Sequence, residues 1–347
     1  MRDTQKPAQK NERRREATGE RIKRREFLAL VGGAAVWPAV GRAQTPPKRS
    51  LVGWLSGGTQ ASSSRFAAYF VQGMQELGYV EGGNFDMPYR YSEGYQDRLP
   101  ALAEDIIRLM PDVILASAVI SAVAARNATS TIPIVCPALA DAVHLGLIAS
   151  IARPGGNVTG IEPYVAGLPA KQMELAREIV PGANKVGLLT DLNDPKAPPQ
   201  MQELEAAGRS LEVETVVAGA SQPDRIEDAL QVLASQRVDV VIVMQSTMLI
   251  SERLQIAKAA LARRLPTVYG YREHVEAGGL VSYGVDLRWC FRRGAYFVDK
   301  ILRGVPPGDL PIEFPTKMIL SLNLKTTQAL GIALSSILLA RIDEFIE

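Results

Sequence analysis

Histidine and cysteine, the side chains most often used to bind transition metals and to carry redox chemistry, are scarce: the 347 residues include two of each. His144 and His274 lie far apart in the sequence, and neither has another ligand at a metal-binding spacing. The chain also lacks a Cys-x-x-Cys pair, a Gly-x-Ser-x-Gly nucleophile motif and a phosphate loop ending in Gly-Lys-Ser or Gly-Lys-Thr. These absences argue against an enzyme, and we expect neither a metal nor any other cofactor.

The two cysteines, Cys136 and Cys290, allow at most one disulfide, which an oxidising compartment would permit. Cys136 ends the apolar run Ile134–Cys136, a setting typical of a buried thiol. We therefore expect two free thiols.

Long apolar stretches and a strong charge imbalance are also missing. No segment reaches the roughly 18 apolar residues of a membrane-spanning helix. Residues 1–43 carry eleven Lys or Arg and five Asp or Glu, a net charge of +6. The remaining residues carry 28 Lys or Arg and 32 Asp or Glu, a net charge of −4. A mildly acidic remainder argues against a nucleic-acid-binding protein.

The N-terminal region has the pattern of an export signal. Arg24 and Arg25 precede an uncharged apolar run, Phe27–Val40, and small residues then lead to a predicted cleavage site between Ala43 and Gln44. A buried helix is the alternative, but the basic flank and the small-residue ending favour a signal peptide. The paired arginines favour the twin-arginine route, although the general secretory route stays open. We expect residues 1–43 to be a signal peptide with a disordered N-terminal extension, and the protein to be periplasmic.

Beyond residue 48, short apolar runs alternate with helical periods. In the first half the sequence predicts strands at 51–56, 85–91, 113–117, 134–136 and 158–162, with helices at 62–78, 95–109, 120–128 and 143–151. In the second half it predicts helices at 168–180, 198–209, 224–235 and 248–264, with strands at 185–190, 213–218, 238–244 and 267–271. A strand at 280–285, a helix at 287–303, a segment at 317–324 and a helical tail follow.

This alternation is typical of parallel βαβ units and predicts an α/β fold with two doubly wound parallel-sheet lobes. We expect residues 48–160 plus about 284–313 to form the first lobe, and 161–283 plus about 314–347 the second. A tail too short for a third lobe would return across the junction, as a multi-strand hinge requires.

Ligands of open parallel sheets bind beyond the carboxyl ends of the strands, and this rule selects the candidate binding residues. The first lobe offers hydroxyls, bare backbone amides and one acid: Ser56, Gly57, Ser62, Ser63, Ser117, Ala118 and Asp141. Ser62, Ser63 and Asp141 have an alternative role as helix caps. Hydroxyls and amides at a helix N-terminus suit a carboxylate.

The second lobe offers acids and amides at the same edge: Asn193, Asp194, Gln245, Thr247 and Tyr269. Asp141 and Asp194 are candidates for pairing with a ligand amine, and Asp194 too could instead cap a helix. Tyr269, Tyr271 and Tyr283 could form an aromatic wall, whereas Trp54, in the middle of a strand, is expected in the core. An acid that contacts the ligand would favour an amino acid, and a cleft with serines alone would favour a plain carboxylate.

Several motifs together resemble a known family. They are the twin-arginine segment, Gly78–Gly82 (GYVEG), Asp141–Val143 (DAV), Arg153–Gly160 (RPGGNVTG), Gly278–Gly284 (GGLVSYG) and Pro315–Lys317 (PTK). Over nearly the whole chain they resemble the ABC transporter substrate-binding proteins related to tryptophan- and tyrosine-binding proteins. The resemblance implies a type I periplasmic-binding-protein fold with a three-stranded hinge. It also implies closure on a small ligand, an amino acid or an aromatic or organic acid, and its delivery to an ABC permease in the inner membrane. We expect the protein to be a monomer.

Two other functional classes remain as alternatives. A small-molecule enzyme on a doubly wound fold would need a titratable cluster in the cleft, and the sequence offers none. A ligand-sensing component of a signalling system would share the two-lobe core, while a transcriptional repressor would need a helix-turn-helix before residue 50, where the sequence instead has the export signal and a linker.

Overall fold

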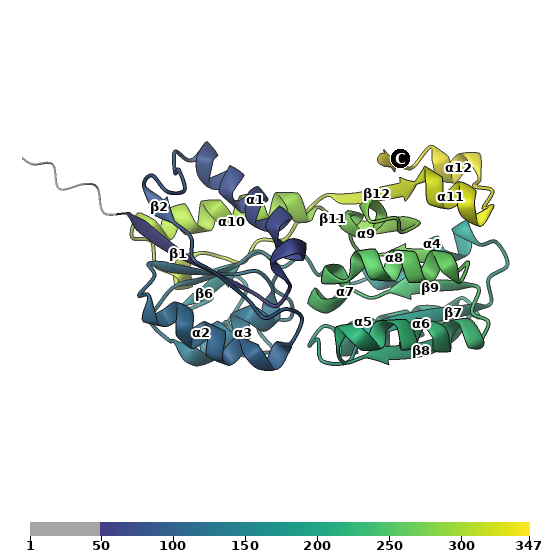
Figure 1. The fold of residues 1–347 in the computed structure, drawn as a ribbon, viewed down its shortest axis with the longest axis horizontal. Coiled ribbons are helices and arrows are strands. Elements are labelled where there is room, and N and C mark those ends of the chain that lie inside the picture. Colours follow the sequence, from purple (N-terminus) through teal and green to yellow (C-terminus); the bar gives the residue numbers. More distant parts are fainter. Residues whose placement is uncertain (1–48) are drawn as a thin grey trace, which may run out of the picture. The chain divides into compact units, whose positions relative to one another are not determined.

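Two β-sheets organise residues 49–347, the part of the chain that the computed structural model describes (Figure 1). The predicted export signal, residues 1–43, lies outside these described residues. Among the described helices, none combines the length and the apolar character needed to cross a bilayer. We call the first sheet with its helices lobe 1, and the second sheet with its helices lobe 2.

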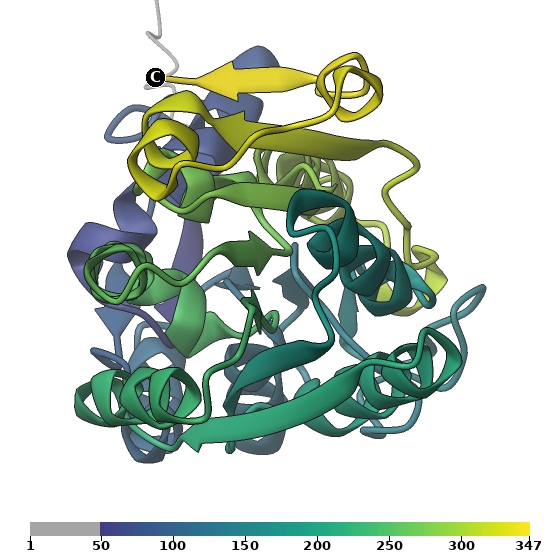
Figure 2. The same ribbon diagram turned by 90° about the vertical axis from the view of Figure 1, so that its right-hand side faces the viewer.

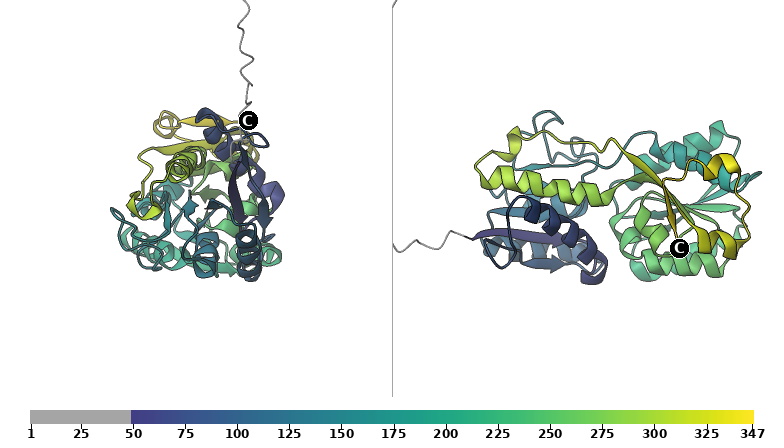
Figure 3. Two further views of the ribbon diagram at one scale, coloured as in Figure 1. Left: turned by 90° about the vertical axis from the view of Figure 1, so that its left-hand side faces the viewer. Right: turned by 90° about the horizontal axis from the view of Figure 1, so that it is seen from above.

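Lobe 1 is built around a sheet of parallel strands in the order β2-β1-β4-β5-β6, with β3 also pairing with β1. Its strands are β1 (Ser50–Ser56), β2 (Phe85–Asp86), β3 (Tyr89–Tyr91), β4 (Val113–Ala116), β5 (Ile134–Cys136) and β6 (Val158–Gly160). Its helices are α1 (Gln60–Glu76), α2 (Leu99–Arg108), α3 (Val119–Ala128) and α10 (Leu287–Leu302). Helix α10 comes from the C-terminal part of the chain and packs against α1 (Figures 1 and 3).

Lobe 2 has the strand order β13-β12-β11-β10-β9-β7-β8, in which only the β11–β12 pair is antiparallel among the described strands. Its strands are β7 (Lys185–Asp191), β8 (Glu214–Ala220), β9 (Val240–Val243), β10 (Thr267–Tyr269), β11 (Val281–Val285), β12 (Met318–Asn323) and β13 (Glu344–Ile346). Its helices are α4 (Leu168–Ile179), α5 (Ala197–Ser210), α6 (Ile226–Ser235), α7 (Thr247–Ser251), α8 (Arg253–Ala262), α9 (Arg272–Glu276), α11 (Leu324–Leu330) and α12 (Ser336–Leu339). Short 3₁₀ segments lie at Gln96–Arg98, Pro223–Arg225 and Pro307–Asp309.

Both faces of each sheet are covered, which explains why the strands read as continuous apolar runs. In lobe 1, alternate β1 residues serve opposite faces: Trp54 belongs to the cluster under α1 and α10, and Leu55 to the cluster under α2 and α3. In lobe 2, α4 and α5 cover one face, while α6 and α8 cover the other (Figure 2). Trp54 is fully buried, as predicted, and Cys136 and Cys290 are free buried thiols, as expected.

The chain crosses between the lobes after β6, after β11 and before β12 (Figure 3). Two of these crossings run side by side, because the Glu313 amide donates to the Gly160 carbonyl at 3.1 Å and the Glu162 amide donates to the Glu313 carbonyl at 2.9 Å. Such paired crossings connect the lobes without interrupting either sheet, as a hinge requires. The lobe boundaries given above from the sequence stay a prediction.

Some predicted elements were wrong. The helix predicted at 143–151 is a series of turns. Asp141, just before this segment (φ 48°), and Gly146, within it (φ 66°), have left-handed backbone conformations, which a right-handed helix does not contain. The strand predicted at 85–91 divides into β2 and β3 before Pro88, which has no N–H to donate. The helix predicted at 248–264 is interrupted at Glu252, and the predicted helical tail ends in a strand, β13.

Candidate functional site

A small cavity lies between the lobes at the carboxyl ends of their strands. Its volume is about 50 Å³, and both lobes contribute polar residues to its lining: Ser56, Gly58, Ser62, Ser63, Ser117, Lys196, Ser246, Thr247, Ser251 and Tyr271. A space of this size holds only a few water molecules, since each needs roughly 10–15 Å³. A larger solute therefore enters only if the lobes separate. We refer to this space as the interlobe cavity.

A second hollow is larger but belongs to one lobe. It is an open groove of about 540 Å³ along α1 and α10, lined by residues such as Tyr69, Trp289 and Arg292. Because lobe 2 contributes nothing to its lining, lobe closure would not enclose a ligand there. The interlobe cavity is thus the better candidate for a site that responds to lobe movement.

Three serines of lobe 1 form a hydrogen-bonded cluster in the lining of the interlobe cavity. The Ser56 hydroxyl accepts from the Gly58 amide at 3.1 Å and from the Ser117 hydroxyl at 3.1 Å, and it lies 2.9 Å from the Ser63 hydroxyl. A hydroxyl has one donor and two acceptor positions. With both acceptor positions used, Ser56 donates to Ser63, which leaves the Ser63 proton free for a ligand oxygen.

Ser62 has the capping role that the sequence offered as an alternative. The Ser62 amide donates to the Thr59 hydroxyl at 3.0 Å, and the Thr59 amide donates to the Ser62 hydroxyl at 3.0 Å, which is a capping box at the start of α1. The Ser62 hydroxyl also donates to the Thr59 carbonyl at 3.1 Å. The hydroxyl of Ser62 lines the cavity, but its proton is already in use.

The charged group at the interlobe cavity is Lys196, which follows β7 in lobe 2 and is 6% exposed. Its ammonium lies 3.8 Å from the Asp194 carboxylate. Burial lowers the pKa of Lys196, but the nearby negative groups, Asp194 foremost, outweigh it and raise that pKa above its usual value. Lys196 is therefore cationic at neutral pH and can attract an anion in the cavity.

Asp194 orients Lys196 instead of facing the cavity. Its Oδ1 accepts from the Lys196 amide at 2.9 Å, and its Oδ2 accepts from the Thr247 amide at 3.2 Å. Neighbouring Asp191 accepts from the Asn193 amide at 3.0 Å through Oδ1, and burial raises the pKa of Asp191 to about 6. Neither carboxylate lines the cavity.

The rest of the interlobe cavity is apolar. Its wall is formed by Phe66, Ala118, Ala138, Ile250, Leu287 and Phe291, and the ring of Tyr271 completes it. Phe66 and Phe291 stack with their ring centroids 4.9 Å apart, which fixes this wall in place. The lining thus combines polar groups that suit an anionic oxygen group with apolar side chains that suit a hydrocarbon or aromatic body.

Half of the twelve binding residues predicted from the sequence come together in this lining. They are Ser56, Ser62, Ser63, Ser117, Ala118 and Thr247. Gly57 is the immediate neighbour of the lining residue Gly58, and its carbonyl accepts from the Ser92 hydroxyl at 2.9 Å.

The other predicted residues lie outside the lining and have other partners. Asp141 is exposed and its amide donates to Glu162 at 2.7 Å, while the exposed Asn193 side chain donates to the Ser221 carbonyl at 2.9 Å. The Gln245 backbone exchanges hydrogen bonds with the Gln200 side chain at 2.8 and 2.9 Å. Tyr269 is fully buried with its ring stacked on His274, 4.6 Å between centroids.

Lys196 is the residue that sequence reasoning missed. It lies two residues beyond Asp194 in the loop after β7, so a search that extended to the end of that loop would have included it. Tyr271, named as a possible wall residue, does line the cavity. Among residues 49–347 no group of three or more His, Cys, Asp or Glu side chains is placed to hold a metal ion.

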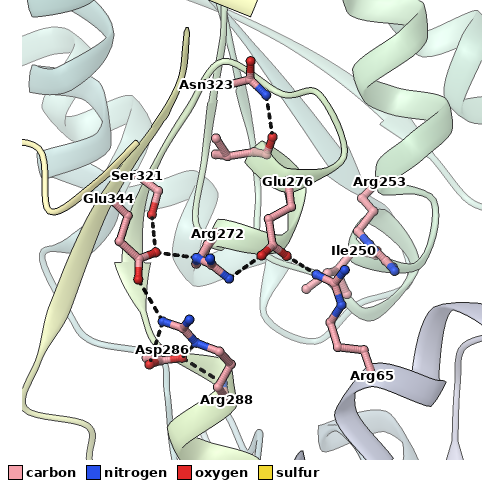
Figure 4. A network of polar contacts seen from close by, with 11 residues as sticks. Arg65, Ile250, Arg253, Arg272, Glu276, Asp286, Arg288, Ser321, Asn323 and Glu344 are labelled. Atoms are coloured by element: carbon pink, nitrogen blue, oxygen red, sulfur yellow. Dashed lines mark hydrogen bonds and ion pairs between the residues drawn. The ribbon is translucent and has the colours of Figure 1, made fainter. Parts of the chain in front are cut away.

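A chain of ion pairs joins the lobes beside the interlobe cavity (Figure 4). Arg65 of α1 in lobe 1 pairs with Glu276 of α9 in lobe 2. Glu276 also pairs with Arg272, which pairs in turn with Glu344 of β13. Arg288 of α10 closes the chain, with its guanidinium 3.1 Å from Glu344. Arg65–Glu276 and Arg288–Glu344 therefore both connect the two lobes.

Replacing Arg65 by glutamine is expected to favour separation of the lobes. The Arg65–Glu276 pair is partly exposed, so its loss should cost up to about 1 kcal/mol, a shift of about fivefold in the ratio of closed to open molecules. Small-angle X-ray scattering should show a larger mean radius of gyration, and 0.5 M salt should reduce the difference from wild type.

Arg292→Gln is the matched control for this prediction. Arg292 pairs with Glu76 at 2.6 Å, and both residues belong to lobe 1. Its loss should leave the radius of gyration unchanged. An equal increase in both variants would show that the pair across the lobes has no particular role.

Comparison with known proteins gives a consistent result. The family model described as "ABC transporter substrate binding protein" matches residues 62–346. The chain is 26% identical over 261 residues to a tyrosine-binding protein of Clostridioides difficile (strain R20291), covering 75% of each chain.

Two solved structures have a similar fold. A conserved domain protein from Vibrio cholerae superimposes with a TM-score of 0.79 at 25% identity, over 86% of this chain and 100% of that one. An ABC domain from Streptococcus pneumoniae, solved in complex with L-Trp, superimposes with a TM-score of 0.79 at 21% identity, with the same coverage.

Proposed function

The chain belongs to the family of ABC transporter substrate-binding proteins, and we propose that it captures a small carboxylate-bearing ligand in the interlobe cavity and presents it to an ABC permease. The observation that carries this proposal is the lining itself. Lobe 1 supplies the Ser63 hydroxyl and lobe 2 supplies the Lys196 ammonium, so one carboxylate can be held by both lobes only when they are close. A ligand that binds the closed form better in this way shifts the equilibrium toward closure.

The apolar wall sets the second requirement for the ligand. Phe66, Phe291 and Tyr271 offer stacking surfaces to an aromatic or branched body. The curated relative is named for tyrosine, and the Streptococcus pneumoniae structure contains L-Trp. Both of those molecules combine a carboxylate with an aromatic ring, which supports an amino acid or an aromatic acid as ligand here.

Cellular location and partners belong to the same proposal. We propose a monomer that works in the periplasm, is exported by the twin-arginine-like signal in residues 1–43, and transfers its ligand to a permease in the inner membrane. Binding without chemical conversion is consistent with the cavity, because Lys196 is held by Asp194 and the lining residues in the described part of the chain include no Asp, Glu, His or Cys. We therefore propose that the protein is not an enzyme.

A thermal-shift screen tests this function. The purified protein should be stabilised by some aromatic or branched carboxylates, with a rise of several degrees when the ligand is in hundredfold excess over Kd, equivalent to about 2.7 kcal/mol. The matching primary amides should give no shift, because Lys196 then faces a neutral group. Absence of a shift with every carboxylate, or equal shifts with acids and amides, would refute the proposal.

A further inference from the structure

The charges that face the interlobe cavity are all of one sign. Lys196 is a cation, and none of the cavity-lining residues among the described part of the chain is an aspartate or glutamate. A free amino acid carries both a carboxylate and an ammonium group. The lining offers a cation to the carboxylate, but it offers no anionic acceptor to the ammonium.

The two acids beside Lys196, Asp194 and Asp191, are directed elsewhere. Both oxygens of Asp194 accept backbone hydrogen bonds, from Lys196 and Thr247, and its side chain has no exposed surface. Asp191 has one oxygen bonded to the Asn193 amide, while its Oδ2 is buried without a hydrogen-bond partner and does not line the cavity. An ammonium on the ligand would have to displace the Lys196 ammonium to reach Asp194, and Asp191 contributes nothing to the lining.

Burying a ligand ammonium here would be unfavourable for two reasons. An ammonium buried here would exchange its hydration for neutral hydroxyl acceptors alone, such as the unpartnered Thr247 Oγ1, with no carboxylate in the lining to offset its charge. The Lys196 cation would also repel it in a low-dielectric space. A carboxylate would meet neither penalty, since Lys196 and Ser63 each have a proton to donate to it.

We infer that the ligand is an aromatic or branched carboxylic acid without an α-ammonium group, such as an arylalkanoic acid. The inference rests on the proposed function, in which the interlobe cavity holds a carboxylate, and it narrows that function from amino acids to simple acids. Lys196 is then the residue that sets specificity, because its charge both attracts the carboxylate and rejects an amine beside it.

Titration calorimetry with matched pairs of ligands tests this inference. Phenylalanine and 3-phenylpropanoate differ only in the α-ammonium group, as do tryptophan and 3-(indol-3-yl)propanoate. In at least one pair the simple acid should bind between about 10-fold and about 100-fold more tightly, the range expected for leaving a buried polar group unpaired. If in every pair that binds the amino acid binds as tightly as its matched acid, or more tightly, the inference is overturned while the proposed function stays in place.

The same titrations with the variant Asp191→Asn test whether Asp191 accepts a ligand amine. If Asp191 is only a buried neighbour, the variant should keep the preference of the wild type for the simple acid. If the wild type prefers the amino acid and the variant loses that preference, Asp191 is the amine acceptor and the inference fails. If no member of any pair binds and no other carboxylate does, the proposed function itself fails and the inference falls with it.

Discussion

Replacing Lys196 by methionine is expected to lower the affinity for a carboxylate ligand by about 100-fold or more. Removing one partner of a buried charged contact typically costs 2–5 kcal/mol or more, because the other charge stays buried and unpaired. Methionine keeps the apolar stem and removes only the ammonium. Titration calorimetry gives the affinity, and a circular-dichroism melt reports whether the fold is retained.

The neighbouring carboxylate makes a control necessary. Lys196→Met leaves Asp194 with its two backbone donors but without a cation, so the single variant is expected to lose stability as well as affinity. The double variant Lys196→Met with Asp194→Asn removes both charges and should fold, yet still fail to bind. Lys185→Met is the matched control. Lys185 pairs with Glu214 at a distance of 3.1 Å, and neither residue lines the cavity. Wild-type affinity in the Lys196→Met variant would contradict the site described here.

Replacing Gly160 by alanine is expected to destabilise the protein by about 3–5 kcal/mol. Gly160 ends β6 with φ at +148°, and a Cβ there would lie 2.0 Å from the carbonyl oxygen of Cys136 in the paired strand β5. The obstacle is backbone, so it cannot move aside as a side chain would. The same residue accepts from the Glu313 amide at the paired crossings, which couples the strain to the junction of the lobes.

Gly156→Ala provides the comparison for this prediction. Gly156 lies four residues earlier, and a Cβ there would meet no atom within 4 Å. Its replacement should change the free energy of unfolding by no more than about 0.5 kcal/mol. Urea denaturation of both variants measures the difference, and similar midpoints would show that the chain relaxes around Gly160.

The fold and the family were predicted well from the sequence because the information is local. Apolar strands covered on both faces, such as Val240–Val243, read as continuous apolar runs between helical periods. The likeness to solved solute-binding proteins confirms the predicted type I periplasmic-binding-protein fold. The predicted family is likewise confirmed.

The local pattern failed where tertiary contacts replaced helical geometry. Leu147 and Ile148 are buried, so their apolar character was read correctly as a packing signal. The backbone conformation around Gly146 nevertheless ends any helix there, and those side chains reach the core from turns. Periodicity identifies burial, but it does not distinguish a short helix from an apolar turn.

The candidate site was only partly predictable for a related reason. The strand-end rule selected the serines of lobe 1 that line the cavity, because Ser56 ends β1, Ser117 directly follows β4, and the other two lie in the first turn of α1. It selected Asp194 and not Lys196. A sequence does not show that both carboxylate oxygens of Asp194 already accept hydrogen bonds from backbone amides. It also selected Tyr269, because that residue ends β10. The tyrosine that lines the cavity is Tyr271, two residues later.

A crystal structure of the protein with a bound aromatic carboxylate tests the central claim most directly. We predict a ligand between the lobes whose carboxylate lies within hydrogen-bond distance of the Lys196 ammonium and the Ser63 hydroxyl, with its ring against Phe66 and Phe291. A ligand bound outside the interlobe cavity, or one whose carboxylate points away from Lys196, would contradict this account.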